Sequence, residues 1–76
     1  MQKQRIEYAS PIDAIVAVSK RLSIYEARHG KPTEEFFDKF AKGQYSDDLD
    51  FVEWANDYRH FLALKFELEK SLRHVA

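Results

Sequence analysis

The chain contains no cysteine, and only two glycines and two prolines occur among its 76 residues. Without cysteine, neither disulfides nor thiolate metal sites can stabilise it. The scarcity of glycine and proline leaves little turn-forming sequence, which favours a few long helices over many short strands. We therefore expect a single all-α domain. A chain this short buries only about 60% of the surface that its unfolded form exposes, so association with another polypeptide is expected to supplement its core.

An excess of charge of one sign is also lacking, because 12 basic side chains are balanced by 13 acidic ones and the formal net charge is −1. No overall electrostatic field therefore draws the chain to nucleic acid or to a membrane. No apolar run approaches the roughly 20 residues of a membrane span, and the first residues lack the apolar core and cleavage site of a signal peptide. We expect no membrane association and a cytoplasmic location.

Capping signals mark the first helix. Ser10 and Pro11 are typical of the cap and the first position of a helix, and Gly30 can supply the left-handed residue that ends one. The sequence therefore predicts a helix from there to about His29. Residues 1–9 precede it and could form either a short strand or a frayed end.

Two further helices are expected. Thr33 is predicted to cap a short second helix with an acidic first turn, and Gly43 is predicted to stop it. Ser46 or Asp47 is then predicted to cap a third helix, which no glycine or proline interrupts before Ala76. The expected fold is two shorter helices followed by one long carboxy-terminal helix, assembled as a helical dimer.

The third helix is expected to be too long for the body of the domain. About 26 helical residues span about 39 Å, whereas a compact chain of this length is roughly 30 Å across. Its first apolar face comprises Phe51, Trp54, Ala55, Tyr58, Phe61 and Leu62, and its second, rotated by roughly 80°, comprises Leu64, Leu68, Leu72 and Val75. We expect the first face to pack within the chain, and residues 63–76 to project as a tail that covers another protomer or another protein.

The first helix also carries an apolar seam, with side chains three and four residues apart. We expect this seam to form the homodimer contact. Its residues are Ile15, Val18, Leu22 and Tyr25.

Acidic residues gather around the start of the third helix, and no basic residue occurs between Gly43 and Tyr58. Such a cluster could cover a basic cleft on a partner and steer association. It could equally be ordinary helix capping on a solvated face. Together with the tail, the candidate partner-binding residues are Asp47, Asp48, Asp50, Glu53, Asp57, Tyr58, Leu64, Leu68 and Leu72.

The aromatic and titratable residues of the third helix do not predict catalysis. Phe51 and Trp54 are expected in the core, and Tyr58 fits the core and a binding surface equally well. His60 lies three residues after Asp57, a spacing at which both could touch one metal ion, but no third ligand follows at helical distance. We therefore expect no metal, no cofactor and no enzymatic activity.

A set of spaced residues in the middle half of the chain resembles small prokaryotic antitoxins of the TumA type. The set reads Tyr25-Glu26, Gly30, Glu34-Glu35-Phe36, Phe40, Gly43, Asp47, Asp50-Phe51-Val52-Glu53-Trp54 and Tyr58. Such proteins often carry a tyrosine before the first glycine and a methionine after it, where this chain has His29 and Lys31-Pro32. The resemblance implies a non-catalytic protein that neutralises a toxin, encoded by a neighbouring gene, by binding it.

Two other interpretations remain open. The chain could be an oligomerisation or scaffold module whose long helix pairs with itself. It could also be a DNA-binding autoregulator of the ribbon-helix-helix kind, with Arg5-Ile6-Glu7-Tyr8 as the strand, although the first helix is long for that module and a second protomer would have to complete the ribbon.

Overall fold

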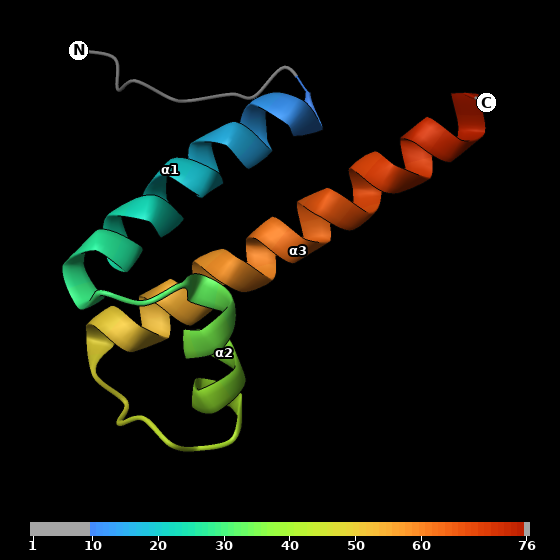
Figure 1. The fold of residues 1–76 in the computed structure, drawn as a ribbon. Helices are drawn as coiled ribbons and strands as arrows, with labels where there is room; N and C mark the ends of the chain where they lie inside the picture. The colour runs from blue at the N-terminus through green and yellow to red at the C-terminus, as the bar shows by residue number, and fades with distance from the viewer. Residues whose placement is uncertain (1–9, 76) are drawn as a thin grey trace, which may run out of the picture.

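The computed structural model describes residues 10–75, and these form helices α1 (Pro11–His29), α2 (Thr33–Ala41) and α3 (Leu49–Val75) without a strand. The expectation of an all-α chain with two shorter helices and one long helix is confirmed (Figure 1). The strand or frayed end predicted for residues 1–9, and with it the strand of a ribbon-helix-helix module, lies outside the described residues.

Helix α1 begins and ends as its capping residues predict. The hydroxyl of Ser10 accepts a hydrogen bond from the Asp13 amide at 3.3 Å, and Pro11 occupies the first helical position. Gly30 follows the helix with φ of 69°, a left-handed conformation that glycine adopts without strain, and its amide donates to the Glu26 carbonyl at 2.8 Å.

Helix α2 is capped differently from the prediction. Thr33 is its first residue and Pro32 is the residue before it, so the prediction that Thr33 caps the helix was wrong. The Thr33 amide instead donates to the carboxylate of Glu26 at 2.8 Å, which satisfies one of the free amides at the helix start from α1. The Thr33 hydroxyl is buried and accepts a hydrogen bond from the Trp54 indole at 3.0 Å. The Thr33 side chain is therefore available to the core, because Glu26 supplies the capping hydrogen bond.

The segment between α2 and α3 also departs from the prediction. After Ala41 the chain turns through Gly43, which has φ of 78° and donates its amide to the Phe40 carbonyl, so the expected glycine stop is present. Helix α3 begins at Leu49 with the Val52 amide donating to the Asp48 carbonyl. Ser46 and Asp47, the predicted caps, therefore lie in the connecting segment.

Two ion pairs fix the register between α1 and α3. Arg21 pairs with Asp57, and Arg28 pairs with Asp50. The two arginines are seven residues apart on α1 and the two aspartates are seven residues apart on α3, and the pairs run in antiparallel order. Continuing this register places Pro11 opposite Glu67. Residues 68–75 of α3 therefore run past the start of α1, over about 12 Å.

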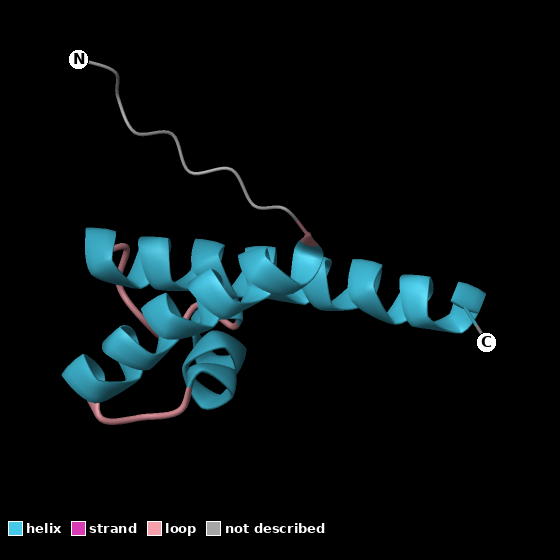
Figure 2. Ribbon diagram, turned by 90° about the horizontal axis from the view of Figure 1, so that it is seen from above, coloured by secondary structure: helices cyan, strands magenta, loops and turns pink. Residues whose placement is uncertain are grey.

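Both ribbon views show this overhang of α3 beyond α1 (Figures 1 and 2). The radius of gyration is 14.6 Å, compared with about 11 Å for a compact chain of this length. The overhang begins later than the predicted tail of residues 63–76, because Leu64 still packs against the cluster of buried core residues. This core cluster comprises Val18, Leu22, Phe36, Trp54 and Ala55.

The core lies where the three helices meet, around Trp54. Its indole is fully buried and stacks on Phe36 of α2 at 3.9 Å between ring centroids. On α1, Tyr25 and His29 lie nearly parallel to the same indole at 5.6 and 5.2 Å. The core position predicted for Trp54 is confirmed, and Phe51 packs half-buried at the margin of the cluster.

The predicted dimer seam of α1 faces this core. Val18 and Leu22 are 1% and 7% exposed within a single chain, and Tyr25 is half-buried against Trp54. The assignment of Val18 and Leu22 to a dimer contact was therefore wrong, because α3 of the same chain already covers them. Ile15, the first residue of the seam, is half-buried.

The bond between Trp54 and Thr33 predicts a specific stability loss. Thr33→Val keeps the shape of the side chain but removes the acceptor, which leaves a buried indole N–H unpaired, and we expect unfolding in urea to become easier by about 1 to 3 kcal/mol. Thr33→Ser retains the hydroxyl and serves as the control, with a smaller loss. Equal stability of the valine variant and the natural protein would contradict this role.

Candidate protein-binding site

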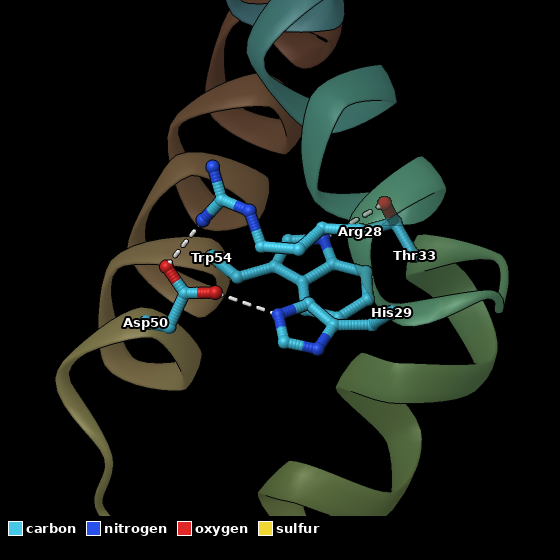
Figure 3. A network of polar contacts seen from close by, with 5 residues as sticks. All are labelled: Arg28, His29, Thr33, Asp50 and Trp54. Atoms are coloured by element: carbon cyan, nitrogen blue, oxygen red, sulfur yellow. Dashed lines mark hydrogen bonds and ion pairs between the residues drawn. The ribbon is translucent and has the colours of Figure 1, made fainter.

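The predicted acidic cluster divides into two groups in the structure. Asp57 accepts hydrogen bonds from Nε and Nη2 of Arg21 at 3.1 and 3.3 Å, and its side chain is 20% exposed. Asp50 accepts from Arg28 Nη1 at 2.7 Å and contacts His29 Nε2 at 2.6 Å (Figure 3). Asp50 and Asp57 therefore join α3 to α1 and are not free carboxylates for a partner.

The contacts of Asp50 change its acidity. The hydrogen bond from His29 lowers the pKa of Asp50 most, partial burial opposes this effect, and Arg28 lowers the pKa further through a hydrogen bond and its charge. The ionised form of Asp50 is therefore the form that the folded chain stabilises. His29 is held on its other side by the stack on Trp54, which fixes the geometry of the contact (Figure 3).

The other acidic residues of the cluster are exposed. Asp47 and Asp48 lie in the segment before α3, and Glu53 lies one turn into it. No salt bridge joins these three to another residue in the part of the chain that the structure describes. The cluster is therefore not one continuous acidic face of a helix.

Two tyrosines lie at the edge of this region, and burial raises the pKa of both. For Tyr25 the carboxylates of Asp57, Glu53 and Asp50 raise the pKa further. For Tyr58 the carboxylate of Glu34 adds to the effect of burial. Tyr58 is half-buried against Phe37, with ring centroids 5.0 Å apart, which places it mainly at the margin of the core.

The predicted apolar tail is partly covered by the chain itself. Leu64 and Leu68 are half-buried, whereas Leu72 is 62% exposed. Two further residues of this helix are exposed that were not among the predicted partner-binding residues, Leu62 at 40% and Phe66 at 61%. Their signal in the sequence was the spacing of four residues, which places both on one side of the helix.

Helix α1 presents a second apolar surface on its outer side. Ile12, Val16 and Ile24 are each about half exposed. Beside Ile24 lies a hollow of about 180 Å³ lined by Arg21, Ile24, Tyr25 and Arg28. These four positions have the spacing i, i+3, i+4 and i+7, the arrangement that receives a side chain from a facing helix in coiled coils.

Residues 10–75 show neither a metal centre nor a membrane helix. No group of three His, Cys, Asp or Glu in this range could hold a metal ion. None of the helices formed by these residues is long and apolar enough to cross a bilayer. Asp57, which with His60 has the spacing of two metal ligands, accepts a hydrogen bond from Arg21.

Comparison with known proteins gave no match to a family model, to a curated protein or to a solved structure. The resemblance to TumA-type antitoxins therefore rests on the spaced residues alone. The structure gives most of these residues a role in the fold: Tyr25 stacks on Trp54, Glu26 caps α2, and Asp50 joins α3 to α1. The pattern thus describes how the three helices are joined.

The lowered pKa of Asp50 predicts how stability changes with pH. Because the pKa is lower in the folded chain than its ordinary value of 3.8, Asp50 stabilises the fold above that value, and the contribution is lost as pH falls through the lowered pKa. Asp50→Asn should therefore be less stable than the natural protein at pH 7, with the difference shrinking below about pH 4. Urea unfolding between pH 7 and pH 3 measures this, with exposed Asp47→Asn as the control. A difference that stays constant down to pH 3 would exclude the assigned role.

The second interhelical pair predicts a salt-dependent effect. Asp57→Asn leaves Arg21 without this charged partner, and because Arg21 is 45% exposed we expect a loss of only about 0.5 to 1 kcal/mol. Glu53→Gln removes an exposed carboxylate four residues away, which has no salt bridge among the described residues, and should change stability little. Urea unfolding at low salt and at 1 M salt should show the Asp57→Asn difference shrinking with salt. Equal effects of the two substitutions would argue against the pair.

Proposed function

We propose that this chain is a non-catalytic protein-binding module that neutralises a partner toxin by direct binding, in the manner of small prokaryotic antitoxins. The observation that supports the proposal most is the overhang of α3. Among the described residues, no helix faces residues 68–75, where Leu72 is exposed. Leu62 and Phe66, on the stretch of α3 just before the overhang, are exposed as well. Large exposed apolar side chains on so small a domain are typical of a protein interface.

The chemistry of the titratable residues supports a binding role over catalysis. His29, Asp50 and Asp57 are ionisable groups, and each is held in a polar contact that joins α1 to α3. A catalytic acid or base has to exchange protons with a substrate, which these constrained pairs could do only by releasing the helices. A cytoplasmic location in a prokaryote is part of this proposal, as is a toxin encoded by a neighbouring gene.

A homo-oligomeric scaffold is the second candidate, and the outer side of α1 favours it. Ile12, Val16 and Ile24 are about half exposed there, and a second copy could cover them. A homodimer formed through this outer surface would also be compatible with the antitoxin proposal, since it leaves the overhang of α3 free.

Co-expression with the product of the adjacent gene tests the proposal. We expect the two proteins to elute together in size-exclusion chromatography, and this chain to restore growth that the other protein arrests. Leu72→Asp should weaken the complex by about tenfold or more without changing the melting temperature, because Leu72 is 62% exposed in the free chain. Lys20→Asp, an exposed change on α1, is the control. Absence of both a complex and a rescue of growth would remove the proposal.

A further inference from the structure

A ridge of alternating apolar and basic character follows the second half of α3. It consists of Leu62, Phe66, Lys70 and Arg73, which at 100° per residue fall within about 80° of the helix circumference. Leu62 is 40% exposed, Phe66 is 61% exposed, and Lys70 and Arg73 are exposed. We call these four residues the basic-apolar ridge.

The ridge is the continuation of a helix face that is covered nearer the start of α3. Ala55 precedes Leu62 by seven residues, lies on the same face and is fully buried. Helix α2 covers this face of α3 as far as Tyr58 and Arg59. The ring of Phe37, on α2, lies 5.0 Å from the Tyr58 ring and 5.3 Å from the Arg59 guanidinium. Beyond that point the described residues cover this face less and less, with Leu62 40% and Phe66 61% exposed, although the face stays apolar for two more turns.

The charge around the ridge is positive, in contrast to the slightly acidic chain. Lys70 Nζ lies 5.7 Å from the centre of the Phe66 ring, which holds the cation beside the aromatic group. Glu69, at the edge of the ridge, is neutralised by Lys65 at 3.5 Å. Glu67 lies about 100° around the helix from Phe66, away from the ridge. An approaching surface therefore meets two apolar groups flanked by cations.

We propose that the basic-apolar ridge inserts into a groove of the partner protein that has an apolar floor and a rim of carboxylates. This inference rests on the proposed function and names the chemistry of its partner. Phe66 and Leu62 are the anchors that lose contact with water, and Lys70 and Arg73 pair with the acidic rim. The mode is that of an amphipathic helix in a groove.

This assignment reverses the direction of charge expected from the sequence. The acidic cluster suggested a basic cleft on the partner, but Asp50 and Asp57 are used within the chain. Their release to a partner would leave Arg21 and Arg28 without these carboxylates. The ridge, by contrast, can bind without breaking any interhelical contact.

The same ridge is a poor match for nucleic acid. A typical DNA-binding surface neutralises about six to ten phosphates, whereas the ridge offers two cations around an apolar centre. The net charge of −1 and the exposed Asp47, Asp48 and Glu53 on the same chain oppose a polyanion further. A protein groove fits the apolar centre as well as the charge.

Calorimetric titration of the full chain into the purified product of the adjacent gene tests the inference. We expect binding to weaken with added salt, Phe66→Ala to weaken it about tenfold or more, and Lys70→Glu and Arg73→Glu to weaken it about three- to tenfold each. Lys20→Glu makes the same charge change on α1 and should bind as the natural chain does. All four variants should keep the natural melting temperature, because each change is at an exposed position.

Each other outcome overturns the inference in a recognisable way. A natural chain that binds, with Phe66→Ala, Lys70→Glu and Arg73→Glu unaffected, leaves the proposed function in place and removes the ridge from it. A natural chain that does not bind removes both. If the chain alone forms oligomers and Phe66→Ala dissociates them, a second copy of the chain occupies the ridge. If the chain is retained on a DNA fragment and Lys70→Glu abolishes the retention, the ridge binds nucleic acid.

Discussion

Trp54 is the residue on which all three helices depend. Its indole stacks on Phe36, donates a hydrogen bond to Thr33 and lies parallel to Tyr25 and His29, so a single side chain of α3 is in contact with both α2 and α1. In a domain this small, a buried ring with a satisfied polar group contributes both area and direction to the core. The position of α2 follows from this contact, because Thr33 at its start and Phe36 one turn later both meet the indole.

The position of Trp54 along α3 decides which part of α3 is left uncovered. Trp54 lies five residues after the start of α3, so α2 and the end of α1 gather at that end of the helix. The two arginine–aspartate pairs then set α1 in a register that ends near Glu67. The overhang of residues 68–75 is therefore a consequence of where the core lies, because α1 begins opposite Glu67 and α2 packs near the start of α3.

Local signals in the sequence were sufficient for the helices and insufficient for their contacts. Ser10, Pro11 and Gly30 act through neighbouring backbone groups, so their roles in α1 could be predicted from the sequence alone. Thr33 was misassigned because the residue that replaces it as the cap, Glu26, belongs to the preceding helix. The seam of α1 was correctly recognised as apolar, but periodicity does not say whether an apolar face meets its own chain or another.

The acidic cluster shows the same limit for the candidate site. Asp50 and Asp57 looked like solvated or partner-facing carboxylates because their partners, Arg28 and Arg21, precede them by 22 and 36 residues. The matching spacing of seven residues on each helix was present in the sequence, yet it becomes a signal only when the antiparallel register is known. Phe66 was not predicted as a binding residue for a related reason. Its exposure depends on how far α2 extends along α3, and the contacts of Phe37 with Tyr58 and Arg59 mark that limit.

Stability restricts which of these groups a partner can recruit. A domain of this size retains only a few kcal/mol of net stability, and each interhelical ion pair at the surface contributes at most about 1 kcal/mol of it. A partner that drew Asp50 away from α1 would also remove the hydrogen bond that orients His29 against Trp54. The packing around Trp54, which positions α2, would then be weakened. Binding through the overhang of α3 carries no such penalty, because its exposed side chains are not part of the core. Under the proposed function, the residues of α3 that hold the fold and the exposed residues that bind the partner are therefore different, so recognition and folding do not compete.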